Sequence, residues 1–399
     1  MKMSPESSKR KIVKQKVHSL TGRITPELVY AAWRAVRANR GAAGIDKVSV
    51  RMFEKNLQPN LDRVLRELKD GSFRPKPARR VYIPKAPGKF RPLGIPAVRD
   101  RIAQEVLRRL LSPLFEVRFH DDSYGFRPGR NAHQAVERVL ELHRQRYTYV
   151  LDADIQGCLD HISHQAVMEE LARVVADGNI LRLVEKFLRA GVLEDGTVHP
   201  TCEGTPQGGV FSPLLANIAL NVLDQFLEEH GYRFVRYADD FVVLCRTQRQ
   251  AEEALALIRP LLFDRLGLEL SPEKTKVTQF RKGFAFLGFD ITSWSVRMRA
   301  KSVENFKSKI RNLTPRSHNL DAEVIGRLNA VIRGTANYFA TEWSACGDAY
   351  RTLDRWIRMR LRCMKLKRKS CYDNRRLRLK HFRRLGLASL HDFIPCPQG

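Results

Sequence analysis

The sequence has few cysteines, and they show no short-range pairing. Seven cysteines occur among 399 residues, without a Cys-x-x-Cys motif. This spacing argues against a zinc site or a disulfide framework and agrees with a reducing compartment. An apolar run of membrane-spanning length, a recognisable signal peptide and an internal repeat are also missing. We therefore expect a cytoplasmic protein that makes no membrane contact.

Acidic residues are scarce relative to basic ones. The chain has 71 Lys and Arg against 43 Asp and Glu, a formal net charge of +28. Such an excess favours a polyanionic partner but does not distinguish RNA from DNA. Between Trp356 and Arg384 the basic residues recur and Asp373 is the only acid. A solvated helix face normally mixes both signs, so this stretch predicts a nucleic-acid surface, with a plain solvated charge run as the alternative.

Two adjacent aspartates stand between two apolar segments. Asp239 and Asp240 follow residues 234–237 and precede residues 241–245, both rich in aromatic and β-branched residues. The pattern predicts two strands joined by a tight turn that carries the carboxylates. Aspartate is common in turns for structural reasons alone. Two like charges beside apolar strands are costly without a cation, so a divalent metal is the functional alternative.

A second strand-like segment also ends in acid. Residues 147–155 are apolar and β-branched and end with Asp152, Ala153 and Asp154. Mg²⁺ prefers hard oxygen ligands and is often held by one or two carboxylates plus substrate phosphates. Asp154 and Asp239 could supply such a site. Two ions held there would clamp the attacking and leaving oxygens of an in-line displacement.

A glycine-rich loop and a helix lie between these acidic segments. Residues 203–213 include Gly204, Gly208 and Gly209, which let backbone approach a ligand closely. The apolar spacing that follows predicts a helix with Ser212 as N-cap, Pro213 at its first position and Gly231 just past its end. The loop alone is weak evidence, because an ordinary structural turn has the same composition.

Taken in order, these segments resemble a known family. The motif residues are Arg91–Pro96, Tyr124–Arg130, Asp152–Ile155, Gly204–Gly209, Tyr237–Asp240, Leu268–Lys276 and Phe286–Phe289. The set resembles the reverse transcriptases encoded by group II introns, the intron maturases. Residues 328–339 resemble the maturase thumb segment. Tyr338, Phe339 and Trp343 alternate there with arginines, which suits either RNA stacking or the packing of a helix.

The resemblance implies a role for each matching residue. Asp154, Asp239 and the adjacent Asp240 would be the catalytic, metal-binding carboxylates. The implied nucleotide-binding residues are Lys85, Arg91, Leu159, Gln207 and Lys274. The implied nucleic-acid-binding residues are Arg127, Arg130, Gly208, Tyr237, Gly288, Arg333 and Asn337, to which the basic stretch adds Arg375, Arg376, Arg378 and Lys380. Leu159 departs from the pattern, because the family usually has an aromatic residue there to screen the sugar 2′ position.

The resemblance implies an α+β right-hand polymerase. We expect an N-terminal extension with fingers over 1–146, a palm of antiparallel sheet and helices over 147–292, a helical maturase-type thumb over 293–369, and a short basic tail over 370–399 without an endonuclease domain. The expected activity is RNA-directed DNA polymerisation with two Mg²⁺ ions, for which Mn²⁺ is a possible substitute. Expected partners are dNTPs, primer or target DNA, and structured RNA such as the parent intron, whose splicing and retrohoming the protein would assist.

Three alternatives stay open. The chain could be a domesticated relative that serves host defence or DNA repair. It could be an RNA-binding splicing factor whose polymerase activity is incidental, although the intact carboxylates argue against this. An RNA-dependent RNA polymerase would share the palm but lack the thumb segment. A bacterial ribonucleoprotein setting is expected, and an organellar one stays open.

Overall fold

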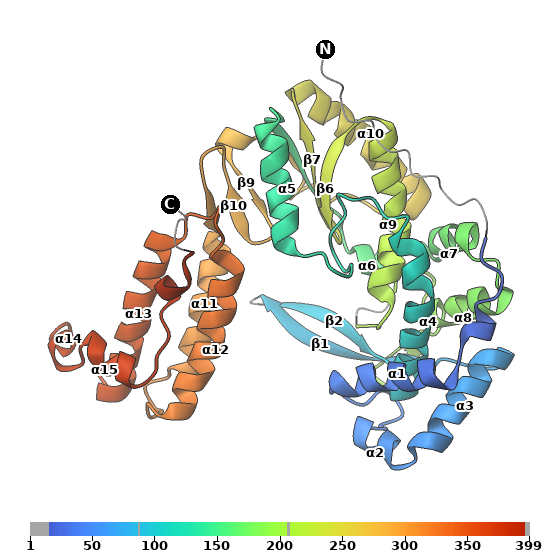
Figure 1. The fold of residues 1–399 in the computed structure, drawn as a ribbon, viewed down its shortest axis with the longest axis horizontal. Coiled ribbons are helices and arrows are strands. Elements are labelled where there is room, and N and C mark those ends of the chain that lie inside the picture. The colour runs from blue at the N-terminus through green and yellow to red at the C-terminus, as the bar shows by residue number, and fades with distance from the viewer. Residues whose placement is uncertain (1–15, 87, 206–207, 396–399) are drawn as a thin grey trace. The chain divides into compact units, whose positions relative to one another are not determined.

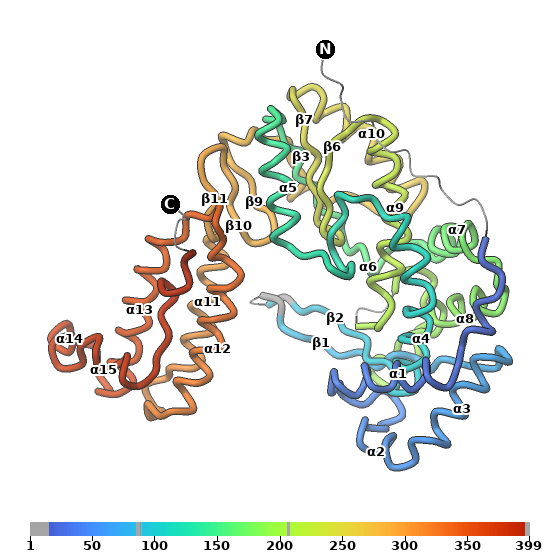
Figure 2. Tube along the Cα trace, viewed as in Figure 1, coloured from blue at the N-terminus to red at the C-terminus, as the bar shows by residue number. Residues whose placement is uncertain are grey.

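The computed structural model describes residues 16–86, 88–205 and 208–395 of the chain. They divide into two compact units (Figures 1 and 2). The first unit comprises residues up to 142 together with 153–276, and the second comprises 143–152 together with the residues from 277 onward. Within the described residues no helix combines the length and apolar character needed to cross a membrane.

The first unit begins with helices that pack on α4. These elements are α1 (Pro26–Ala38), α2 (Val50–Lys55), α3 (Leu57–Asp70) and α4 (Val98–Glu116). Thr25 caps α1 by accepting the Leu28 N–H at 3.3 Å, and Pro26 takes the first helical position. The apolar face of α1 is buried, with Trp33 stacked on Phe53 at 5.3 Å between ring centroids. This helical layer supports the hairpin that follows α3.

A β-hairpin follows α3. Strands β1 (Ala78–Ala86) and β2 (Lys89–Ile95) pair antiparallel, with Ile83 opposite Arg91. The sheet continues through β4 (Val192–Glu194) and β5 (Thr197–His199) in the order β2-β1-β4-β5. Pro87, between the two strands, lies outside the described residues.

The remaining elements of the first unit surround the acidic motifs. They are α5 (Ala132–Arg144), α6 (Cys158–His161), α7 (His164–Val174), α8 (Gly178–Leu188), α9 (Ser212–Glu229), β6 (Arg233–Tyr237), β7 (Asp240–Cys245) and α10 (Gln248–Leu266). Strands β6 and β7 belong to a sheet with the order β6-β7-β3-β8, in which β3 (Tyr149–Asp154) and β8 (Lys276–Gln279) each contain residues of both units. Its apolar residues pair across β6 and β7, where Phe234 faces Val243 and both are buried.

Helix α9 is where sequence and structure differ by one residue. The expected N-cap, Ser212, is instead the first helical residue, and Phe211 holds the N-cap position without a side-chain cap bond. Ser212 is buried in the first turn of the helix. The predicted end is confirmed, because Gly231 follows the helix with φ +73°.

The second unit combines a small sheet with long helices. The sheet has the order β11-β10-β9, from β9 (Phe284–Phe286), β10 (Phe289–Ile291) and β11 (Val296–Met298). The helices are α11 (Ala300–Leu313), α12 (Ala322–Phe339), α13 (Gly347–Leu366), α14 (Asp373–Arg376) and α15 (Leu379–Arg384), followed by the 3₁₀ turn η3 (Leu390–Phe393). Phe382 and Leu390 are buried, so the basic C-terminal stretch is packed rather than free of the helices.

Candidate active site

The paired aspartates lie at a two-residue turn, as the sequence predicts. Strands β6 and β7 pair so that Tyr237 stands opposite Asp240, which leaves Ala238 and Asp239 as the turn. Ala238 has φ +60°, a left-handed conformation that a residue with a Cβ adopts at a cost of roughly 1–2 kcal/mol. The turn projects Asp239 into solvent, while Asp240 is half-buried at the first position of β7.

A buried arginine holds this turn from behind. The Arg236 guanidinium donates to both carboxylate oxygens of Asp224 on α9, at 2.7 and 2.5 Å. Its third nitrogen, Nη1, donates to the Ala238 carbonyl at 2.9 Å and to Asn217 Oδ1 at 3.0 Å. Arg236 and Asp224 are both fully buried. The Arg236 side chain therefore links the strained turn to α9 through hydrogen bonds.

The motif at residues 124–130 flanks the same turn. Arg236 N–H donates to the Asp122 carbonyl and Tyr124 N–H donates to the Arg236 carbonyl, so this segment runs beside β6. A Cβ added at Gly125 would lie 2.2 Å from the Ala238 nitrogen, and this close approach requires glycine. Asn217 also donates to the Gly125 carbonyl at 2.8 Å.

The two arginines of that motif have structural partners. Arg127 is buried, and it donates to Glu116 and to the carbonyls of His120 and Ser123. Arg130 pairs with Asp121 at 3.1 Å and lies 5.5 Å from the centre of the Tyr124 ring. Arg127 thus helps to hold the segment beside the turn in place. A direct contact with nucleic acid would have to break these hydrogen bonds.

Asp154 comes to the site at the end of β3. Ser271 N–H donates to the Asp154 carbonyl at 2.8 Å, and Gln156 N–H donates to the Glu269 carbonyl at 2.9 Å. The segment 269–271 thus runs beside 154–156 and carries Lys274 to the carboxylate. Lys274 Nζ lies 2.7 Å from Asp154 Oδ2, with both side chains partly exposed.

One cavity of about 840 Å³ collects most of the predicted catalytic and nucleotide-binding residues. Asp154, Asp239, Leu159, Arg91 and Lys274 all line it. The tip of the hairpin that carries Lys85 contributes Phe90, whereas the side chain of Lys85 and all of Gln207 lie outside the described residues. The sequence did not point to Phe126 and Cys158, which also line the cavity. A single apolar side chain in a turn or a short helix gave no signal for them.

Leu159 is fixed by the glycine-rich loop. Its carbonyl accepts the Thr205 N–H at 2.6 Å, and the Ile162 carbonyl accepts the Gly204 N–H at 2.9 Å. A Cβ at Gly204 would lie 2.3 Å from the Asp160 carbonyl oxygen, and φ is +76° there. The glycine therefore lets the loop pack directly on α6. Half-buried in the cavity wall, Leu159 occupies a defined place beside Asp160.

Gly208, on the far side of the same loop, approaches β2. A Cβ on it would lie 2.7 Å from the Gly94 carbonyl oxygen, and its φ is +106°. The loop then ends where the Val210 N–H donates to Gln104 Oε1 at 2.8 Å. Backbone contacts to α6, β2 and α4 thus hold the described ends of the loop.

The donor set suits a hard cation. Asp154 and Asp239 offer carboxylate oxygens to one cavity, and Mg²⁺ often takes only one or two protein carboxylates while substrate phosphates complete its shell. No group of three or more His, Cys, Asp and Glu side chains suited to a metal occurs in the part of the chain that the structure describes. The residues fit an ion that arrives with a nucleotide better than a closed structural site.

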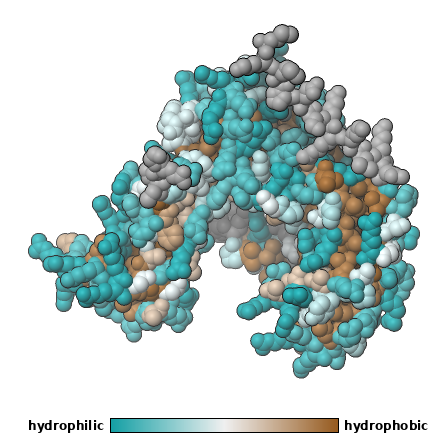
Figure 3. Space-filling model, in the orientation of Figure 1, coloured by the Kyte–Doolittle hydropathy of each residue, from teal (hydrophilic) through white to brown (hydrophobic). Residues whose placement is uncertain are grey.

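The second unit contains the other predicted nucleic-acid contacts. Tyr338 donates to the Leu287 carbonyl at 2.9 Å, and Phe289 has the rings of Tyr338, Phe339 and Trp343 within 5.6 Å. These aromatics form a packed cluster. Gly288, at φ +82°, lies beside it. The exposed predicted residues on this unit are Arg333, Asn337, Arg375, Arg376, Arg378 and Lys380, and Figure 3 shows a mainly hydrophilic face over α14 and α15.

Comparison with known proteins agrees with this geometry. Residues 83–291 match the family model described as reverse transcriptase (RNA-dependent DNA polymerase). That range is more than half of the chain and includes both aspartates. The chain belongs to the reverse transcriptase family. Residues 303–385 match the model described as group II intron, maturase-specific domain, which places it among the group II intron-encoded reverse transcriptases.

Curated relatives lead to the same family. Protein YkfC of Escherichia coli is 36% identical over 303 residues, covering 66% of this chain and 80% of YkfC. The group II intron-encoded protein LtrA of Lactococcus lactis is 30% identical over 362 residues, covering 73% of this chain and 58% of LtrA. The chain thus spans a little over half of LtrA. A solved telomerase from Candida albicans is 14% identical with a TM-score of 0.44, covering 84% of this chain and 66% of that one, too distant to add to the assignment.

The family settles the enzyme class. This reverse transcriptase is an RNA-directed DNA polymerase with a mixed α+β fold of the right-hand polymerase type. The maturase-specific match over the second unit is the feature that an RNA-dependent RNA polymerase was expected to lack.

Proposed function

We propose that Asp154 and Asp239 hold the divalent ions for nucleotidyl transfer and that the second unit binds structured RNA, in particular the parent intron, to copy it and assist its splicing. The observation that carries the first part is the shared cavity, where both carboxylates meet Arg91, Leu159 and Lys274. The maturase-specific match and the exposed basic residues of α14 and α15 support the second part.

In the proposed reaction the primer 3′-oxygen attacks the α-phosphorus of a dNTP, a new P–O bond forms and pyrophosphate leaves. Bound Mg²⁺ would supply Lewis-acid stabilisation of the attacking and leaving oxygens. The chain contributes position and charge. Arg236 holds the turn that presents Asp239, and Arg91 at the cavity rim offers a guanidinium to the triphosphate. Leu159 limits the space beside the sugar.

Lys274 has two roles in this scheme. Without nucleotide it neutralises Asp154 through the 2.7 Å ion pair. Asp154 would offer its carboxylate to a bound Mg²⁺, and the exposed Lys274 amine would then be available to the phosphates, where its charge would stabilise the departing pyrophosphate. The same lysine therefore keeps the empty site balanced and assists the chemical step.

The test is primer extension on an RNA template by Asp239→Ala and Asp154→Ala. Both should lose dNTP incorporation while RNA affinity stays near wild type, because phosphate binding is spread over many basic residues. Asp264→Ala, on the exposed face of α10, is the matched control and should extend normally. Retained extension by either site variant would refute the metal assignment.

A further inference from the structure

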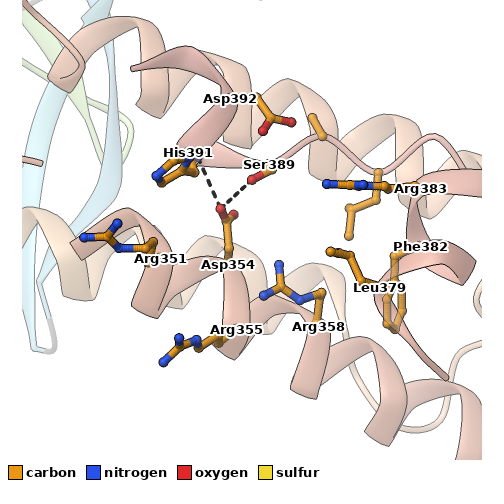
Figure 4. Close-up of a pocket in the computed structure, with 12 residues that line it drawn as sticks. Arg351, Asp354, Arg355, Arg358, Leu379, Phe382, Arg383, Ser389, His391 and Asp392 are labelled. Atoms are coloured by element: carbon orange, nitrogen blue, oxygen red, sulfur yellow. Dashed lines mark hydrogen bonds between the residues drawn. The ribbon is translucent and has the colours of Figure 1, made fainter. Parts of the chain in front are cut away.

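A second cavity, of about 310 Å³, lies wholly within the second unit. Helix α13 forms one side, α15 another, and the segment from Leu387 to Asp392 a third (Figure 4). Four of its lining residues are arginines: Arg351, Arg355, Arg358 and Arg383. None of the family motifs includes this pocket.

Hydrogen bonds hold the segment from Leu387 to Asp392, which forms the wall opposite α13. Asp354 on α13 is buried, and its Oδ2 accepts the Ser389 hydroxyl at 2.6 Å and the His391 N–H at 3.2 Å. Its Oδ1 accepts the Leu390 N–H at 2.9 Å. Figure 4 shows this carboxylate turned toward Ser389 and His391 of the segment. Three donors on one buried carboxylate make the pocket preformed.

A second anchor holds the start of the same segment. Asn329 on α12 donates to the Gly386 carbonyl and accepts the Ala388 N–H, each at 2.8 Å. With Asp354, this fixes residues 386–391 at both ends. The wall is thus part of the folded unit, although it lies beyond the last basic helix.

The charges lining the pocket are not balanced. Arg351 pairs with Asp348 at 2.5 Å. Among the described residues, by contrast, the structure gives the guanidinium groups of Arg355, Arg358 and Arg383 no hydrogen bond or ion pair. The guanidinium groups of Arg358 and Arg383 extend from different helices toward the middle of the pocket in Figure 4. Bringing two such groups together is unfavourable unless an anion joins them.

The excess positive charge also affects the pKa of a neighbouring arginine. The pKa of Arg362, one turn after Arg358 on α13, is lowered from its ordinary value by burial and by the positive charge of Arg358. The acidic lining residues are Asp354 and Asp392. Asp354 already accepts three hydrogen bonds, so its oxygens are directed at the wall and not at the arginines.

We propose that this pocket binds one phosphodiester group of a nucleic-acid strand through Arg358 and Arg383. Guanidinium forks match phosphate oxygens in geometry and charge. Leu379, which is 44% exposed, and Leu387 lie beside the arginines and suit an adjoining sugar or base, which a free phosphate ion lacks. The inference rests on the proposed RNA binding and assigns it a defined contact.

The test uses the full chain and a fluorescent oligouridylate in anisotropy titrations over a series of KCl concentrations. The double variant Arg358→Gln/Arg383→Gln should bind about tenfold more weakly, the effect expected when charge-assisted hydrogen bonds are removed. Its log–log salt slope should fall by about 0.7, because one phosphate of the single strand is no longer neutralised. Arg249→Gln/Arg259→Gln on exposed α10 positions removes the same charge and should change both quantities less.

Asp354→Ala separates pocket shape from net charge. It removes a negative charge, so electrostatics alone would strengthen RNA binding. A loosened wall at Ser389 and His391 should weaken it instead, and thermal melting will show whether the variant is folded. If Asp354→Ala unfolds, the test of the pocket rests on the Arg358→Gln/Arg383→Gln variant alone.

Two results would overturn the pocket: arginine variants that match the α10 control, or tighter RNA binding by folded Asp354→Ala. Failure of the wild-type chain to bind RNA at all is a different outcome, because it removes the proposed RNA partner itself.

Discussion

The Arg236 guanidinium lies on the carboxylate of Asp224, with Nη2 2.5 Å from Oδ2, and both side chains are completely buried. One partner is on β6, two residues before the turn that carries Asp239, and the other is on α9. Since the same guanidinium reaches the Ala238 carbonyl, the ion pair couples the position of Asp239 to the packing of α9. This relationship separates stability from catalysis in a way that substitutions can test.

Breaking the pair should destabilise the protein, and removing both charges should not restore activity. Asp224→Leu alone leaves Arg236 buried and unpaired, at a cost of about 3–5 kcal/mol. The double variant Arg236→Met/Asp224→Leu should recover most of that stability. It still lacks the donor to Ala238, so kcat for primer extension should stay well below wild type. Thermal unfolding measures the change in stability, and single-turnover extension measures the change in kcat. A double variant with wild-type kcat would show that activity does not require the hydrogen bond from Arg236 to the Ala238 carbonyl.

The sequence predicted the turn but not what supports it. Aromatic and β-branched residues on both sides of the Asp239–Asp240 pair are a local pattern, and they predicted the β6–β7 hairpin. The contacts of Arg236 with Asp224 and Asn217 join residues that the chain separates by 12 and 19 positions. The sequence shows only that Arg236 and Asp224 each lie in an apolar segment. That pattern does not reveal that the two side chains pair.

Two other features depend on tertiary packing. The sequence left open whether Tyr338, Phe339 and Trp343 stack on RNA, form core, or do both on different faces. Their rings cluster around Phe289, with Phe339 buried and the other two half-buried. Arg127 belongs to a motif that the family resemblance assigned to nucleic acid, yet its donors go to Glu116 and to backbone carbonyls. Both results depend on tertiary neighbours that periodicity does not reveal.

Lys274 offers a test in which the apparent affinity for Mg²⁺ rises while kcat falls. Lys274→Ala removes the cation that competes for Asp154, so the Mg²⁺ concentration for half-maximal extension should fall. It also removes a positive charge near the leaving group, so kcat at saturating Mg²⁺ should fall by about tenfold. Lys274→Arg keeps the charge and should lie between Lys274→Ala and wild type. An unchanged Mg²⁺ requirement in Lys274→Ala would mean that the ion pair does not compete with metal.

Leu159 should set part of the sugar selectivity. Its backbone is held by the Thr205 N–H, so a larger or smaller side chain changes the cavity wall without moving the loop. Leu159→Phe should raise the preference for dATP over rATP and Leu159→Ala should lower it, each by about tenfold, the usual effect of a small change in pocket shape. Relative kcat/KM for the two nucleotides is the measurement. Equal ratios in all three proteins would assign sugar choice to another residue.

The exposed basic residues of α14 and α15 should contribute to binding by neutralising phosphates. Arg375, Arg376, Arg378 and Lys380 are all exposed, while Leu377 between them is buried and its carbonyl accepts the Arg362 guanidinium at 2.9 Å. The four charges therefore stand on a fixed scaffold, and glutamine at each should leave the fold intact, as melting will verify. The quadruple variant should bind long structured RNA more weakly, with a log–log salt slope smaller by about 0.7–0.9 for each phosphate that is no longer neutralised. A short primer–template engages fewer phosphates, so its affinity should change less. A wild-type slope on the long RNA would mean that these residues are a solvated charge run, and RNA binding by the second unit would then depend on other arginines, such as Arg358 and Arg383.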